Sequence, residues 1–121
     1  NIAVLDENTQ VVYDWQMAGV GPPMLDVVAF VLKSEWWFGG LPLGRGLIAQ
    51  EYRKLLAKIS GQRWTDERWD ELWDHALMWR FLQEWLDLLA ISPSTLLEAR
   101  SEQLEELWFE PLAKAVARRL L

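Results

Sequence analysis

Apolar residues recur at the spacing of an α-helix along most of the chain, and this periodicity constrains the fold most. Between residues 47 and 59 they stand at positions 47, 48, 52, 55, 56 and 59, and Gly61 follows as a helix stop. Thr65 is the expected N-cap of a second helix, whose middle is apolar nearly all round. We therefore expect this second helix to be central and buried in a mostly α-helical protein.

The C-terminal part repeats the same signals. Ser92 and Pro93 form an N-cap followed by proline at the first helical position, which predicts a helix from there to about Phe109. Pro111 is expected to break this helix before a last one, because an interior proline removes a hydrogen bond.

The first sixteen residues predict a β-hairpin instead. Residues 2–5 and 11–13 are short β-prone runs, and residues 6–9 between them supply turn chemistry. Neither run alternates between apolar and polar residues, which indicates that both faces of the hairpin are covered.

These predicted elements make up a single domain with three parts. The β-hairpin covers residues 1–16, a Gly/Pro loop with a short helix and a second loop covers 17–46, and a helical subdomain covers 47–121. Within the middle part, the short buried helix is expected over 24–33 and the loop over 39–44. The fold class is mostly α, of the α+β type.

Composition excludes several function classes. The 121 residues contain no cysteine and one histidine, so disulfides, thiolate catalysis and His-rich metal sites are ruled out. The net charge is −6, and residues 66–110 hold twelve Asp and Glu against three Arg, which makes nucleic acid a poor partner. Such a surface attracts cationic small molecules or simply keeps helix faces solvated. No apolar run has the length of a membrane span, so we expect no membrane partner and a cytoplasmic location.

Asp14 is the first candidate for chemistry. It follows a β-prone run and precedes a loop rich in Gly and Pro, where a carboxylate suits a hard cation such as Mg²⁺. An Asp at the end of a strand is also a common turn or cap residue, and position alone does not decide between the two roles.

The stretch NIAVLDENTQVVYDWQMAGVGPPMLDVVAF resembles the C-lobe core of aminoglycoside phosphotransferase and choline-kinase-like enzymes, which share the protein-kinase-like fold. Their pattern is H-G-D-x-x-x-x-N-I, a β-hairpin, and I-D-W-E-x-A-x-x-G-x-P-x-x-D-L-A. Asn1 and Ile2 match the end of the first block, and residues 14–16 match the start of the second. Ala18, Gly21, Pro23 and residues 26–28 follow in register. The specific match covers residues 1–28, and a weaker similarity extends to the tryptophan-containing stretch 51–79.

The resemblance implies roles for individual residues. Asp14 would correspond to the Asp that holds Mg²⁺ beneath the nucleotide phosphates, and Asn1 to the catalytic-loop Asn on the other side of the metal. Asp26 would brace the catalytic loop, and a plain helix N-terminal carboxylate is the alternative interpretation. Gln16 replaces the more usual Glu, which leaves the subfamily open.

The same resemblance implies parts that these residues do not contain. The H-G-D block with the catalytic Asp would lie just before Asn1, and the nucleotide-binding lobe further upstream. We therefore expect a C-lobe fragment of an ATP- or GTP-dependent kinase acting on a small-molecule hydroxyl. Alone it should be inactive and bind neither Mg²⁺ nor nucleotide. The alternative is a non-catalytic helical interaction or oligomerisation module, and an unrelated helical protein with a chance D-W motif is a third possibility.

Two acidic residues are weaker candidates for substrate binding. Asp70 and Asp74 are four residues apart on one helix, where they would meet a cationic substrate or form a solvated surface. His75 is nearby and has no second ligand candidate, so we expect a packed or surface histidine.

Tryptophan is the other unusual feature, with nine residues in the chain. Trp69, Trp73 and Trp85 follow helical spacing and are expected in the core. Trp36 and Trp37, followed by Phe38, either line a substrate or partner surface or pack under the adjacent Gly-rich loop.

Substrate identity stays open among aminoglycoside, choline, homoserine, sugar and steroid-like acceptors. Without a partner lobe, the hairpin and the helix at 24–33 should expose apolar surface. We therefore expect a homo-oligomer that associates through the free edge of the hairpin.

Overall fold

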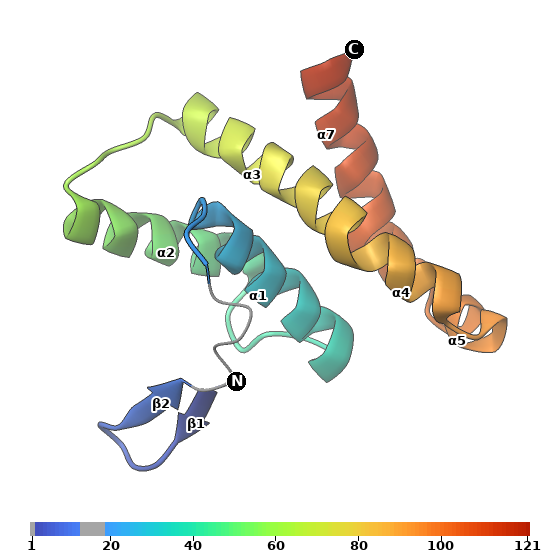
Figure 1. Cartoon of the computed structure of the whole chain (residues 1–121), viewed down its shortest axis with the longest axis horizontal. Coiled ribbons are helices and arrows are strands. Elements are labelled where there is room, and N and C mark those ends of the chain that lie inside the picture. Colours follow the sequence, from blue (N-terminus) through green and yellow to red (C-terminus); the bar gives the residue numbers. More distant parts are fainter. Residues whose placement is uncertain (1, 13–18) are drawn as a thin grey trace.

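A computed structural model of the chain describes residues 2–12 and 19–121 (Figure 1). A two-stranded hairpin is followed by helices, as the sequence predicts. The elements are β1 (Ile2–Val4), β2 (Gln10–Val12), α1 (Met24–Phe38), α2 (Arg45–Ser60), α3 (Asp66–Arg80), the π-helical turn η2 (Phe81–Trp85), α4 (Leu86–Ile91), α5 (Ser94–Ala99), α6 (Ser101–Leu104), the π-helical turn η3 (Glu105–Phe109) and α7 (Glu110–Leu120). Among the described helices, none combines the length and apolar character that a membrane span requires.

The hairpin is antiparallel, with Ile2 paired to Val12 and Val4 paired to Gln10. Its turn is closed by Asp6, whose Oδ1 accepts a hydrogen bond of 2.9 Å from the backbone N–H of Asn8. The side chains of Val4 and Leu5 are 68% and 67% exposed, and none of residues 3–12 belongs to the buried core. The expectation that both hairpin faces are covered is therefore wrong for the described residues. An apolar run indicates that a strand face is suited to burial, but it does not show that another segment packs against that face.

α1 is longer than the sequence predicts. The helix continues past Lys33 and ends only at Gly39, whose φ of 72° lies in the left-handed region that favours glycine. α1 buries the side chains of Val28 and Val31 completely and that of Trp36 almost completely. The additional turns thus bring Trp36 into the core.

α2 and α3 begin and end near the predicted residues. Gly61, with φ 71°, ends α2, and Thr65 caps α3 by accepting a hydrogen bond of 3.2 Å from the backbone N–H of Arg68. α3 continues through η2 into α4, since Phe81 keeps right-handed helical backbone angles. The prediction of a central helix is confirmed, since α3 packs against both α1 and α7. The expectation that this helix is buried is confirmed for one side only, because Trp79 and Leu82 are 56% and 63% exposed.

The C-terminal helices divide at a different residue than predicted. The helical run breaks at Arg100, where φ is −120°, and Pro111 lies inside a continuous helix. The backbone N–H of Glu110 donates to the carbonyl of Glu105, so the wider π turn directly precedes the proline. Because this turn changes which carbonyls lie opposite Pro111, the proline sits in the first turn of α7 without ending the helix.

The core lies where α1, η2 and η3 meet. Three tryptophans form its centre: the ring centroids of Trp36 and Trp85 are 5.2 Å apart, and those of Trp85 and Trp108 are 4.5 Å apart. Each of the three is at most 2% exposed. Since every ring comes from a different segment, the contacts between these three rings join the N-terminal and C-terminal halves of the helical part.

Candidate functional site

The two predicted metal ligands, Asn1 and Asp14, lie outside the described residues. The structure describes the strand positions beside them: Asn1 precedes Ile2, Asp14 comes two residues after Val12, and Ile2 pairs with Val12. Within residues 2–12 and 19–121, no group of three or more His, Asp or Glu side chains is arranged to hold a metal ion. Metal binding by Asp14 and Asn1 therefore stays a prediction.

Asp26 lies in the first turn of α1, where a carboxylate meets the positive end of the helix dipole. Its side chain is 83% exposed, and its Oδ1 is 3.6 Å from Nη2 of Arg80. Arg80 also donates a hydrogen bond of 3.0 Å to the carbonyl of Leu25 and pairs with Glu84. Asp26 thus borders a guanidinium that joins α1 to the central helix, as a helix N-terminal carboxylate would, and loop bracing stays a prediction.

Asp70 lines a cavity of about 530 Å³ between the start of α2 and α3. Trp69 and Trp73 form its apolar part. Asp66 also lines it but is paired with Arg53 at 2.7 Å, whereas Asp70 forms no ion pair in the described part of the chain. Asp70 is therefore the carboxylate of this cavity that remains available to a cationic group.

Arg45 also lines this cavity, and its guanidinium is bound to carboxylates other than Asp70. Nε of Arg45 is 3.0 Å from Glu35, and its Nη2 is 2.9 Å from Glu106. Arg45 thereby joins the start of α2 to α1 and η3. Both guanidiniums at this cavity are bound to other carboxylates, so Asp70 has no ion pair with either, although Arg118 of α7 lies close enough to interact with its charge.

Asp74 does not have the solvated position proposed for it. Its side chain is 3% exposed and accepts hydrogen bonds from Arg118 at 2.6 and 3.1 Å and from Arg119 at 2.8 Å. Burial raises the pKa of Asp74, but the hydrogen bonds from the two guanidiniums outweigh this effect and hold the pKa below its usual range. The solvated-surface interpretation is wrong for Asp74, and both of its oxygens are already occupied by cations from α7.

The two adjacent tryptophans have different environments. Trp36 is 2% exposed, and Arg100 lies over its ring at 4.8 Å while donating a hydrogen bond of 2.6 Å to its carbonyl. The proposed substrate surface is therefore wrong for Trp36. Trp37 and Phe38 are 56% and 82% exposed, so packing under the loop is wrong for them, and Trp37 remains an accessible candidate.

The core prediction is confirmed for Trp69 and Trp85 and only in part for Trp73, and the expectation of a packed or surface histidine is confirmed. Trp69 and Trp85 are buried, Trp73 is half-buried against the core, and His75 is a surface histidine. His75 borders an apolar groove of about 590 Å³ that lies between the segment before α1 and the middle of α3. The groove contains no acidic side chain.

The sequence analysis missed a basic cavity between α2 and the link to α3. Arg53, Lys58 and Arg63 are among its lining residues. The signal was present in the sequence, because Lys54 and Lys58 are four residues apart and share a helix face in an otherwise acidic chain.

Comparison of the chain with protein-family models, with curated proteins and with solved structures finds no match.

Proposed function

We propose that this chain is the substrate-side part of an ATP- or GTP-dependent kinase that phosphorylates a hydroxyl group of a small molecule. The observation that carries the proposal is the order of elements in residues 2–38. An antiparallel hairpin is followed by a Gly/Pro segment and by a helix with Asp26 in its first turn. The resemblance to aminoglycoside phosphotransferase-like enzymes implies this same order.

The strand register supports the proposed metal site. Phosphoryl transfer depends on positioning and on neutralising charge, so two metal ligands on adjacent strand ends serve it directly. Asn1 directly precedes Ile2, Asp14 comes two residues after Val12, and Ile2 and Val12 are paired. In this proposal the two residues hold Mg²⁺, and Mg²⁺ binds the nucleotide phosphates.

The cavity beside Asp70 supports a substrate with a positively charged amine. Asp70 supplies a carboxylate without an ion pair among the described residues, and the half-buried Trp73 supplies aromatic surface, while Arg53 already lies over the buried ring of Trp69. A cation is attracted to both kinds of group. Amine-bearing acceptors such as aminoglycosides or choline therefore fit this cavity better than neutral sugars do.

The metal site is tested by titrating the protein expressed from its full natural reading frame with Mn²⁺ in the presence of nucleotide and following the backbone NMR signals of β1 and β2. Paramagnetic broadening is expected at Ile2 and Val12, and Asp14→Asn should remove it. Asp6→Asn is the matched control, because it removes the same charge at the turn end of the hairpin. Equal effects of the two substitutions, or no broadening at all, would contradict the proposal.

The activity is tested on the protein expressed from its full natural reading frame. Transfer of labelled γ-phosphate from ATP or GTP to a panel of aminoglycoside, choline, homoserine and sugar acceptors is measured. We expect transfer to an amine-bearing acceptor, and Asp70→Asn should raise KM for that acceptor with little change in kcat. Absence of transfer to every acceptor would count against the kinase.

A second candidate, a non-catalytic oligomerisation module, is favoured by one specific observation. Large apolar side chains of the hairpin and of the segment after it are exposed, including Leu5 at 67% and Val20 at 110%. Exposed apolar residues on a short two-stranded sheet favour association with another surface. Self-association without any phosphoryl transfer would favour this module over the kinase.

A further inference from the structure

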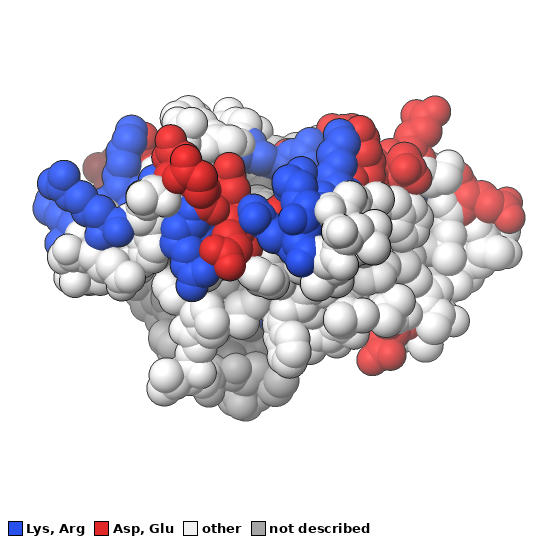
Figure 2. All heavy atoms as spheres, turned by 90° about the horizontal axis from the view of Figure 1, so that it is seen from above, with Lys and Arg blue, Asp and Glu red and all other residues white. Residues whose placement is uncertain are grey.

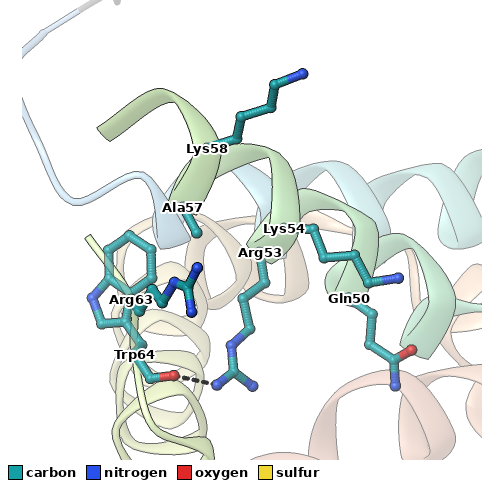
Figure 3. A pocket seen from close by; sticks show the side chains of 7 residues that line it. All are labelled: Gln50, Arg53, Lys54, Ala57, Lys58, Arg63 and Trp64. Carbon is teal, nitrogen blue, oxygen red and sulfur yellow. Dashed lines mark hydrogen bonds between the residues drawn. The ribbon is translucent and has the colours of Figure 1, made fainter. Parts of the chain in front are cut away.

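A concentration of positive charge lines a cavity beside the link between α2 and α3. The cavity has a volume of about 680 Å³. The residues that line it include Arg53, Lys54, Lys58, Arg63 and Trp64 (Figure 3). No Asp or Glu lines it. In a protein with a net charge of −6, four cationic side chains around one cavity form a distinct local field.

Arg53 forms the fixed wall of this cavity. It pairs with Asp66 at 2.7 Å, donates a hydrogen bond to the carbonyl of Trp64, and lies 5.4 Å from the ring centroid of Trp69. The bond to Trp64 is the dashed line in Figure 3. These contacts hold the link against α2 and use the charge of Arg53, so its role is to position the cavity.

Arg63 has no such partner. It forms no ion pair with any residue that the structure describes, and Figure 3 shows its guanidinium between the Trp64 ring and Arg53. Lys58 is also without an ion pair in residues 2–12 and 19–121, and it extends away from Arg63 toward the rim. Lys54 pairs with Glu51 at 2.6 Å, with both side chains largely exposed. The unneutralised charge thus centres on Arg63, and Lys58 adds to it from the rim.

Trp64 supplies an apolar surface beside this charge. Its ring is half-buried, and the ring centroid lies 5.9 Å from that of Trp69 at an angle of 57°. Because the carbonyl of Trp64 and not its indole N–H is bound by Arg53, the ring is held in place by packing. An aromatic surface next to a free guanidinium matches a ligand that has both a ring and an anionic group.

We propose that this cavity binds a small organic phosphate monoester that carries an aromatic or other apolar group. A monoester has a charge between about −1.5 and −2 at pH 7, which the guanidinium of Arg63 would bind, while Lys58 extends away from Arg63 and adds only to the surrounding positive field. The cavity has the size of a small-molecule site. The acidic character of the chain as a whole disfavours a nucleic acid as the source of the phosphate. This inference does not rest on the kinase proposal.

The test uses phenyl phosphate as the probe, with phenol and inorganic phosphate as the two partial ligands. Binding to the purified chain is measured by calorimetry in a phosphate-free buffer, and NMR follows the side-chain N–H signals of Arg63 and Trp64. Phenyl phosphate should bind at least tenfold more tightly than either partial ligand and shift both signals. Arg63→Gln should weaken its binding by about tenfold, which is the usual effect of losing one charge-assisted hydrogen bond.

Arg68→Gln is the matched control. It removes the same charge from an exposed arginine at the start of α3 that does not line this cavity, and its binding constant should stay within twofold of the unmodified chain. Trp64→Leu keeps the backbone carbonyl that Arg53 binds and should lower the affinity for phenyl phosphate but not for inorganic phosphate. Equal weakening by Arg63→Gln and Arg68→Gln, equal affinity for inorganic and phenyl phosphate, or no binding would each overturn the proposal.

Discussion

At the scale of single residues, the interaction of Asp74 with Arg118 and Arg119 is the clearest structural feature. One buried carboxylate from α3 accepts three hydrogen bonds of 2.6 to 3.1 Å from α7. Removing one partner of a buried ion pair leaves the other charge without compensation, which is more costly than losing a surface pair. The interaction of Asp74 with Arg118 and Arg119 therefore has a structural role, although sequence spacing places Asp74 beside the solvent-exposed Asp70.

We predict that Asp74→Asn lowers the free energy of unfolding by about 2 kcal/mol, somewhat less than for a fully buried pair because Arg118 is half-exposed. Asp70→Asn removes the same charge one turn earlier from an exposed side chain and should change the free energy by less than about 0.5 kcal/mol. Urea denaturation followed by circular dichroism measures both. Similar effects for the two variants would show that the Asp74 interaction contributes no more than a surface charge.

The lowered pKa of Asp74 also predicts a dependence of stability on pH. A carboxylate whose pKa is lower in the folded chain stabilises it fully above the ordinary pKa of aspartate. This contribution declines as the pH falls below that value and is lost once the folded pKa is passed. The free energy of unfolding should therefore fall less steeply below about pH 4 in Asp74→Asn than in the unmodified chain. Parallel curves would mean that Asp74 has the same pKa in both states.

At the scale of elements, local signals predicted the end of α2 and the start of α3, but not the end of α1 or the division of the C-terminal helices. Thr65 and Gly61 act through the backbone of their own turn, so their roles were predictable. The burial of Asp74 depends on α7, which lies more than forty residues later. Pro111 was misinterpreted because a π turn before it depends on how η3 packs. The prediction of a metal site rests on Asn1 and Asp14, which lie outside the described residues.

Gly61 provides a test of helix termination. With φ at 71°, an alanine at this position is strained, so Gly61→Ala should lower the free energy of unfolding by about 1 kcal/mol. Gly46→Ala is the control within the same helix, because Gly46 lies in the first turn of α2 with open space around it, and alanine should leave stability unchanged or raise it slightly. Thermal unfolding compares the two, and a loss of similar size in both would contradict the role of φ.

At the scale of the whole molecule, charge is distributed unevenly over the surface. Figure 2 shows Lys and Arg side chains at the end where Figure 1 has the link between α2 and α3, both signs side by side in the middle, and Asp and Glu at the opposite end. The basic cavity lies at the first end, and the cavity of Asp70 lies between α2 and α3. The two cavities share Gln50 and Arg53 in their linings, so the tests of the two proposals are separated by substituting Arg63 and Asp70, each of which lines only one of the two.

The exposed hairpin predicts self-association of the whole chain. Leu5 and Val11 are 67% and 41% exposed on a sheet of two strands, and covering them in a second copy removes apolar surface from water. We expect light scattering at micromolar concentration to show dimers or larger species. Leu5→Lys and Val11→Lys should each shift the population toward monomer, because a buried ammonium is costly.

Ile59→Lys distinguishes association through the hairpin from non-specific association of exposed apolar surface. Ile59 is 75% exposed at the end of α2, so the substitution removes comparable apolar surface from a different element with the same change of charge. If association is driven by the hairpin, this variant keeps the oligomeric state of the unmodified chain. If all three lysine variants become monomeric to the same degree, a change in net charge accounts for the effect. A clean monomer before any substitution would remove the structural argument for an oligomerisation module.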